Sequence, residues 1–158
     1  MKLRHIIIAC AALFCCFGGN LQAQTDKAPA KGGDAILGEY FIKDEKAEDS
    51  KVRFTKNADG TYACTIFWIE TENDPATGKP WTDSKNPDKS LRNRPLIGVK
   101  LIESIPYDAK KNAWTGGKIY DPNRGLKANA TISITEDGRL KVSGKILGIG
   151  ETQYWDRL

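Results

Sequence analysis

Residues 114–158 read WTGGKIYDPNRGLKANATISITEDGRLKVSGKILGIGETQYWDRL, and this stretch decides the fold. Apolar and polar residues alternate through residues 127–135 and again through 139–146, which is the period of a strand with one buried face. Between these two segments, Asp137-Gly138 supplies the positive φ angles that a tight hairpin turn needs. The stretch therefore predicts a β-hairpin within a closed, antiparallel β architecture.

The same alternation extends this prediction along the chain. Strands are expected at residues 36–42, 51–55, 61–70, 97–105, 113–120, 127–135, 139–147 and 151–157. Turns rich in Gly, Asn, Asp and Pro separate them, and no segment has a convincing helical period. We therefore expect an all-β fold, a small antiparallel up-and-down barrel of about eight strands, wide enough for its own side chains or one small ligand.

Residues 71–96 interrupt the pattern. They contain four prolines and only two large apolar side chains before Leu96. We expect one long loop here, and loops of this length in compact domains are usually lids, binding loops or disordered segments.

The first 23 residues have the pattern of a secretory signal peptide. Lys2 and Arg4 precede an apolar run at residues 6–17, which is too short to span a bilayer, and cleavage is expected after Ala23. A flexible leader at 24–35 and a single barrel domain at 36–158 should follow. We therefore expect a periplasmic or secreted protein.

Lipid attachment is the alternative to a cleaved soluble product. It is less favoured because no small residue precedes Cys15 or Cys16, and because Cys10 comes too early in the apolar run.

Charge and length exclude several classes of partner. Cleavage after Ala23 would leave 22 basic and 20 acidic residues, a net charge of +2, with no basic stripe. Binding to nucleic acid is therefore not expected. Stable membrane insertion is not expected either, because no later segment is long and apolar enough.

The sequence offers little catalytic chemistry. Its one histidine, His5, lies in the signal peptide, which removes histidine-based catalysis and metal ligation. Cys64 lies mid-strand and is expected to be a small buried hydrophobe that makes no internal disulfide. Asp74, Asp83 and Asp88 are expected to be solvated turn residues, with a weak cation site as the alternative. We therefore expect no catalytic residue, no cofactor and no enzyme.

The two ends of the domain predict a structural latch. Gly38 and Tyr40 lie at its start and Trp155 and Arg157 at its end, so they meet only if the barrel closes. A guanidinium over the Tyr40 ring would contribute about 0.5–2 kcal/mol. A ligand contact is the alternative role.

Arg92 and Arg94 share one face if their segment is extended. They could hold a carboxylate or phosphate, or they could satisfy loop carbonyls. Both roles stay open from the sequence.

Four motifs carry a resemblance to a known family. They are Asp83-x-x-Asn86-Pro87-Asp88-x-x-Leu91-Arg92-x-Arg94-Pro95-Leu96-x-Gly98, Trp114-x-x-Gly117-x-Ile119-Tyr120-Asp121-Pro122-x-x-Gly125, Leu140-x-Val142-x-Gly144 and Thr152-Gln153-x-Trp155-x-Arg157. In this order, over residues 36–158, they resemble the bacterial family called "domain of unknown function 2147". The resemblance implies a small exported protein and a calycin-like barrel, the group that includes lipocalins. Tyr40 replaces the family's Trp, and Lys127-Ala128 stands where members usually have an aromatic residue. The resemblance implies no reaction.

Two functional hypotheses follow. In the first, the barrel binds one small apolar or amphipathic molecule, with Tyr62 and Trp68 lining the interior and Trp81, Arg92 and Arg94 covering the mouth. Its counterpart is a barrel that these aromatic residues simply fill. In the second hypothesis, the loop at 71–96 docks into an envelope protein, as the loop of an inhibitor does.

Overall fold

The computed structural model describes residues 32–44, 47–146 and 149–158. The expected signal peptide and leader residues 24–31 lie outside these ranges. The described chain forms two short 3₁₀ helices and nine strands. These are η1 (Gly32–Ile36), β1 (Gly38–Ile42), β2 (Ser50–Lys56), β3 (Tyr62–Ile69), η2 (Lys89–Leu91), β4 (Lys100–Ile105), β5 (Tyr107–Asp108), β6 (Ala113–Asp121), β7 (Leu126–Ile134), β8 (Leu140–Ile146) and β9 (Ile149–Arg157). Neither described helix is long and apolar enough to cross a membrane.

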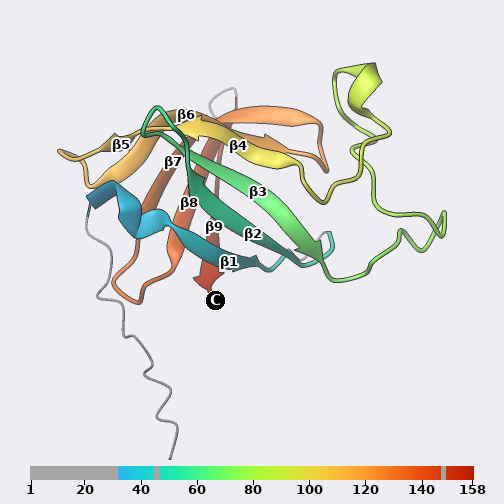
Figure 1. Cartoon of the computed structure of the whole chain (residues 1–158), viewed down its shortest axis with the longest axis horizontal. Helices are drawn as coiled ribbons and strands as arrows, with labels where there is room; N and C mark the ends of the chain where they lie inside the picture. Colours follow the sequence, from blue (N-terminus) through green and yellow to red (C-terminus); the bar gives the residue numbers. More distant parts are fainter. Residues whose placement is uncertain (1–31, 45–46, 147–148) are drawn as a thin grey trace, which may run out of the picture.

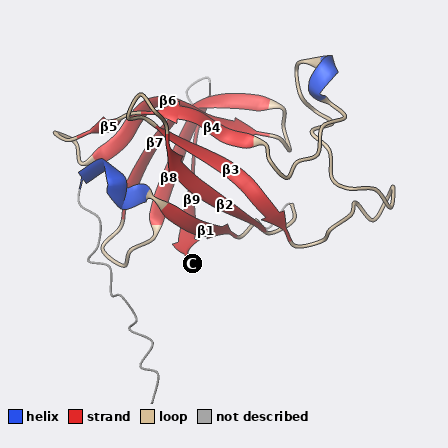
Figure 2. Cartoon of the chain, viewed as in Figure 1, coloured by secondary structure: helices blue, strands red, loops and turns tan. Residues whose placement is uncertain are grey.

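The strands form one antiparallel sheet in the order β4-β3-β2-β1-β9-β8-β7-β6-β5 (Figures 1 and 2). Neighbours in the sheet are consecutive in the chain except β1 and β9, which pair through Tyr40 with Arg157 and Phe41 with Asp156. The predicted all-β, up-and-down barrel is therefore confirmed. The ninth strand, β5, has only two residues, too few to give an alternating pattern.

The sheet curls into a nearly closed barrel, in which β4 lies close to β6. A side chain at Gly117 of β6 would place its Cβ 2.5 Å from the carbonyl oxygen of Ser104. Beside it, the Thr115 amide donates to the Pro106 carbonyl at 3.1 Å. A glycine at this position lets the two strands come together, as the close approach requires.

The η1 helix closes one end of the barrel, which we call the closed end. Its Gly33 carbonyl accepts a hydrogen bond from Trp114 Nε1 at 3.1 Å, and its Ile36 carbonyl accepts one from the Tyr40 hydroxyl at 2.9 Å. Asp34 accepts a hydrogen bond from Tyr62 and forms an ion pair with Lys56. Residues 32–35 are thus part of the packed domain, whereas the sequence predicted a flexible leader over residues 24–35.

Large side chains fill the closed end. They are Ile36, Tyr40, Phe54, Tyr62, Cys64, Ile105, Trp114, Ile132 and Leu140, all buried. The Tyr62 and Trp114 rings meet edge to face, as do those of Tyr40 and Phe54, an arrangement that aromatic quadrupoles favour. Burial raises the pKa of the Cys64 thiol well above its usual value, so this group is an apolar core element.

Candidate functional site: a cavity at the open end of the barrel

The opposite end of the barrel, the open end, contains a cavity of about 590 Å³. Its wall combines strand residues Ile42, Ile66, Ile69, Leu101, Ile119, Ala128, Val142, Gly144, Gln153 and Trp155, all from strands that also build the closed end. Its mouth is bordered by the loop after β1, the loop after β3 and the turn after β6. The volume lies within the usual range of small-ligand sites, roughly 300–1,000 Å³.

The cavity exists because two wall positions carry almost no side chain. Ala128 on β7 pairs with Ile119 on the neighbouring strand β6. Gly144 on β8 lies next to Ala128, since a Cβ added at Gly144 would be 3.2 Å from the Cβ of Ala128. Further along the same two strands, Ile132 and Leu140 occupy the corresponding inward positions and are fully buried. Because the inward residues of β7 and β8 are small at the open end and large at the closed end, only the open end has space for a cavity.

Trp155 and Gln153 give the wall an aromatic surface and an amide. Trp155 is almost fully buried, and its indole Nε1 donates to the Gln153 Oε1 at 3.1 Å. The Trp155 ring also packs against Phe54 of the closed end, with centroids 6.4 Å apart. Trp155 therefore separates the filled half of the barrel from the cavity.

The long loop contributes an apolar edge to the mouth. Thr82 and Pro95 form an isolated antiparallel bridge, and the Leu96 amide donates to the Trp81 carbonyl at 2.9 Å. This pairing holds Trp81 and Leu96 against the cavity, and Trp81 Nε1 donates to the Thr71 carbonyl at 3.1 Å. Figure 1 shows the remainder of the loop, with η2, projecting beyond the sheet.

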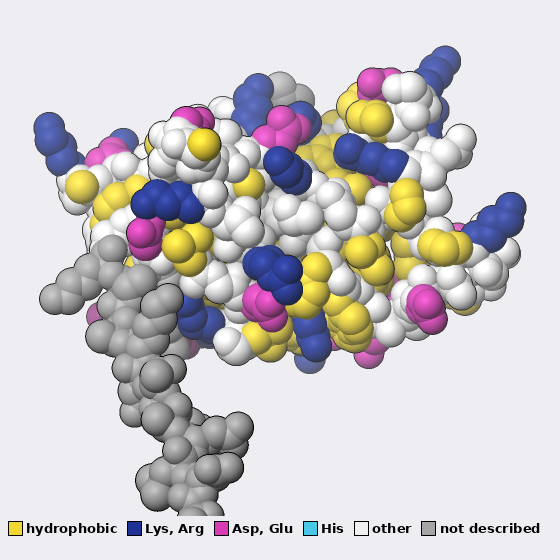
Figure 3. All heavy atoms as spheres, viewed as in Figure 1, with side chains coloured by type: hydrophobic (Ala, Val, Ile, Leu, Met, Phe, Trp, Pro, Cys, Tyr) yellow, Lys and Arg dark blue, Asp and Glu magenta, His cyan; other side chains and the backbone are white. Residues whose placement is uncertain are grey.

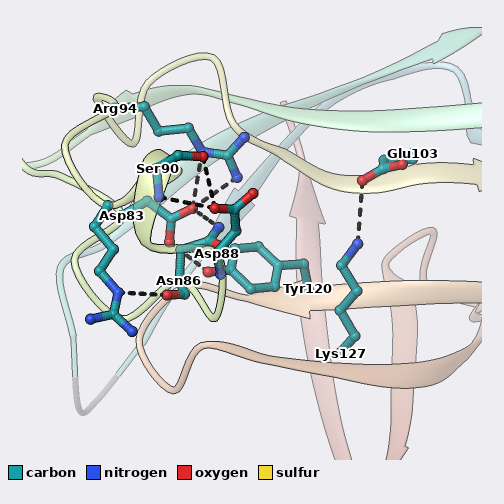
Figure 4. A network of polar contacts seen from close by, with 9 residues as sticks. Asp83, Asn86, Asp88, Ser90, Arg94, Glu103, Tyr120 and Lys127 are labelled. Carbon is teal, nitrogen blue, oxygen red and sulfur yellow. Dashed lines mark hydrogen bonds and ion pairs between the residues drawn. The ribbon is translucent and has the colours of Figure 1, made fainter.

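A buried carboxylate fastens this loop to the barrel (Figure 4). The Asp83 side chain is fully buried and accepts hydrogen bonds from the Tyr120 hydroxyl at 2.5 Å and from Asn86 Nδ2 at 2.6 Å. Arg94 donates to it through Nε at 3.0 Å and Nη2 at 2.8 Å. Tyr120 belongs to β6, so this network links residues 83–94 of the loop to the barrel wall.

Burial alone would raise the pKa of Asp83, but the hydrogen bonds from Tyr120, Asn86 and Arg94 outweigh it and hold that pKa below its usual value. The pKa of the Tyr120 hydroxyl is raised, by burial and by its hydrogen bond to Asp83. Asp83 is therefore ionised and Tyr120 neutral at neutral pH, which is the combination the network needs.

Only one of the five predicted ligand-binding residues, Trp81, lies at the cavity. Arg94 is engaged by Asp83, and Arg92 donates through Nε to the Asn86 carbonyl at 2.7 Å. Arg92 thus satisfies a loop carbonyl, the second of the two roles that the sequence left open, whereas Arg94 holds the carboxylate of Asp83 in the same loop. Neither arginine lines the cavity. Tyr62 is inside the barrel but at the filled end, where it contacts Trp114.

The prediction that Trp68 lines the interior is wrong. The β3 register shifts so that Ile66 pairs with Val52 and Trp68 with Lys51, which leaves Phe67 as an extra bulge residue. Beyond the bulge the alternation reverses, and the Lys51 ammonium lies 4.5 Å from the centre of the Trp68 ring. Figure 3 shows apolar side chains interspersed with Lys and Arg on the face where β1 to β3 lie in front.

Three of the four predicted latch residues, Gly38, Tyr40 and Arg157, lie together at the closed end. The Arg157 guanidinium is 5.3 Å from the Tyr40 ring centre and donates to the Tyr40 hydroxyl at 2.7 Å. It also donates to the carbonyls of Ala35 and Leu37. Gly38 makes room, since a Cβ there would lie 3.0 Å from the guanidinium. Trp155 sits deeper, at the cavity wall.

Sequence reasoning did not single out the charged residues at the mouth. Arg124 of the β6–β7 turn pairs with Asp121 and with Glu151 of β9, and Asp44 and Glu48 line the mouth from the β1–β2 loop. The pair of Arg124 with Asp121 is local to one turn, but the pair with Glu151 and the approach of Glu48 to the same mouth depend on tertiary structure and leave no signal in the sequence. Within the described ranges, no cluster of three His, Cys, Asp or Glu side chains could hold a metal ion.

A barrel of this topology is found in a solved structure, "Protein HP1028 from the human pathogen Helicobacter pylori belongs to the lipocalin family". The two chains are 24% identical, with a TM-score of 0.63, and the match covers 78% of this chain and 82% of the other. The fold therefore defines a lipocalin-like β-barrel. The chain itself belongs to the family described as "Uncharacterized protein conserved in bacteria (DUF2147)", which it matches over residues 38–157.

Proposed function

We propose that this chain is an exported, non-enzymatic protein that binds one small apolar or amphipathic molecule in the cavity at the open end. The observation that carries the proposal is the cavity itself, about 590 Å³ within a barrel whose other end is filled. Small barrels of lipocalin type can hold one small ligand in their interior. The apolar wall would contact the body of the ligand, and the polar mouth its exposed end.

The most direct test is native mass spectrometry of protein purified from the periplasm of its own organism. The expected spectrum contains the polypeptide with one bound small molecule, which is lost on denaturation. The same measurement tests export, since the polypeptide mass should correspond to a chain that begins at Gln24. A full-length cytoplasmic product would contradict export.

A cavity-filling variant tests the location. Ala128→Leu places three additional carbons in the cavity, so it should abolish retention of the small molecule while the protein stays folded. Lys127→Leu, on the outer face of the same strand, adds a leucine without entering the cavity and should retain the molecule. Retention by Ala128→Leu would place binding elsewhere.

Docking through the long loop is the second candidate, favoured by the fact that the loop is fastened through Asp83 while its outer part projects from the barrel (Figures 1 and 4). Residues 73 and 80 form a bridge, so 74–79 can be replaced by a short Gly-Ser turn without touching the cavity. Loss of co-purifying envelope proteins in this variant, with the small molecule retained, would support docking as a separate activity.

A further inference from the structure

The charges at the mouth of the cavity are mostly negative. Among the described residues that line it, Glu48, Asp121 and Glu151 are acidic, whereas Arg124 is basic. This local excess of acid is opposite in sign to the chain as a whole, which carries a formal net charge of +4. The rim therefore differs from the average surface of the protein.

Arg124 cannot act as a binding site for an anion. Its guanidinium is already held by two carboxylates, with Nε donating to Asp121 and Nη2 to Glu151, both at 2.5 Å. These two hydrogen bonds raise the pKa of Arg124 further. Arg92 and Arg94, which the sequence placed at the mouth, are engaged by the Asn86 carbonyl and Asp83.

Glu48 is the carboxylate of the rim that is available to bind a cation. It is half-buried at the cavity mouth, and within residues 32–44, 47–146 and 149–158 no ion pair to it is formed. The half-buried Trp81 ring borders the same cavity and offers an aromatic face of the kind that attracts organic cations. Carboxylate, aromatic face and apolar wall together match a molecule with an apolar body and a positive end.

We propose that the ligand of this cavity is an amphipathic cation, such as an amine with an aliphatic or aromatic body. The inference rests on the proposed function, which it deepens by giving the charge of the ligand. The body lies along Ile66, Ile119 and Val142, and the ammonium group lies at the rim near Glu48. An anionic amphiphile of the same shape is disfavoured, because its carboxylate would meet the carboxylates of the rim.

The test uses three probes of equal chain length, decylamine, decanol and decanoate, below their aggregation concentrations. Binding is followed by calorimetry and by the intrinsic tryptophan fluorescence, to which Trp81 and Trp155 at the cavity contribute. Decylamine should bind about tenfold more tightly than decanol, and decanoate more weakly than decanol. The preference for the amine should shrink at high salt, because ions screen partly exposed charges.

Decanoate binding as tightly as decylamine would overturn the charge assignment while leaving the proposed function intact. Failure of all three probes to bind would overturn both the assignment and the site.

Two variants of Glu48 sharpen the result. Glu48→Gln should weaken decylamine binding about threefold, and Glu48→Lys more than tenfold, while decanol binding stays unchanged in both. Glu136→Gln, in the turn between β7 and β8 at the closed end, is the matched control and should bind all probes as the unmodified protein does. Equal decylamine affinity in Glu48→Lys would overturn the inference.

Discussion

The closed and open ends of the barrel are built by the same strands and differ mainly in side-chain size. On β7 and β8 the closed end has Ile132 and Leu140, both fully buried, whereas the open end has Ala128 and Gly144. The closed end is also sealed by η1, while a long loop borders the open end. The pairing of β7 with β8 runs without a register shift from Asn129 with Lys145 to Ile134 with Leu140. In this barrel, therefore, the place of a cavity is set by the residues that are too small to fill it.

The largest difference is expected between two tryptophans. Trp114→Ala removes a buried ring that contacts Tyr62 and Tyr107, so the free energy of unfolding measured in denaturant should fall by about 3–5 kcal/mol. Trp81→Ala removes a half-buried ring at the cavity mouth and should cost less than about 1.5 kcal/mol, with a larger effect on ligand affinity. Equal costs would show that the closed end is not the main source of stability.

At the open end, the charge of the Asp83 carboxylate should contribute to stability through its contacts with Arg94 and Tyr120. Asp83→Asn leaves Arg94 without its anion and one amide donor facing other donors, and should lower the free energy of unfolding by about 3 kcal/mol. Because the pKa of Asp83 is lowered in the folded state, this contribution is complete above the unfolded pKa of about 4 and is lost as the pH falls below it.

Denaturant titrations of the unmodified protein and of Asp83→Asn, each at pH 7 and pH 3, measure this dependence. The difference in the free energy of unfolding between the two proteins should be smaller at pH 3 than at pH 7. Asp156→Asn, at an exposed position of β9, is the control and should leave the free energy of unfolding unchanged at both pH values. A gap that stays constant with pH would contradict the role of the Asp83 charge.

Two alanines on one strand compare the packing of the ends directly. Ala130→Leu adds three carbons near the filled core and should destabilise by about 1–3 kcal/mol through overpacking. Ala128→Leu adds the same atoms where space exists, so its thermal unfolding midpoint should match that of the original protein or exceed it. The comparison fails if Ala128→Leu is the more destabilised variant.

The smallest effect concerns the latch at the closed end. Arg157→Ala should lower stability by about 1–2 kcal/mol, because it removes stacking on Tyr40 and hydrogen bonds to two carbonyls. Arg139→Ala is the control. Its guanidinium also lies over a ring, that of Tyr154, but at an exposed position, and its loss should cost less than about 0.5 kcal/mol. Equal denaturation midpoints in the two variants would contradict the latch.

The fold could be predicted from the sequence because alternation is a local signal. It placed eight strands and the turn at Gly138, whose φ of +84° is the positive angle expected there. It failed at Trp68, because the bulge at Phe67 depends on pairing with β2 and leaves no mark in the sequence of β3. It also missed η1, whose residues are ordered by contacts with Trp114 and Tyr62, far away in the chain.

The cavity was harder to predict than the fold. The small residues Ala128 and Gly144 were visible in the sequence, but whether neighbouring strands fill the space beside them depends on register. Asp83 was grouped with Asp74 and Asp88 as a turn residue, whereas its carboxylate is buried by contact with Tyr120 of β6. Asp74 and Asp88 do accept hydrogen bonds from the backbone of their own turns. Local patterns thus predicted the roles of Asp74 and Asp88 but did not separate the buried Asp83 from them.

The pairing of β1 with β9 has a consequence for the order of folding. Tyr40 and Arg157 are separated by 117 positions in the chain, so the sheet cannot close until the last strand has been synthesised. Until then β1 has one unpaired edge, the kind of edge that attracts other strands. Contacts of such long sequence separation also slow folding. We expect truncation of the final strand to give an aggregating chain rather than a looser barrel.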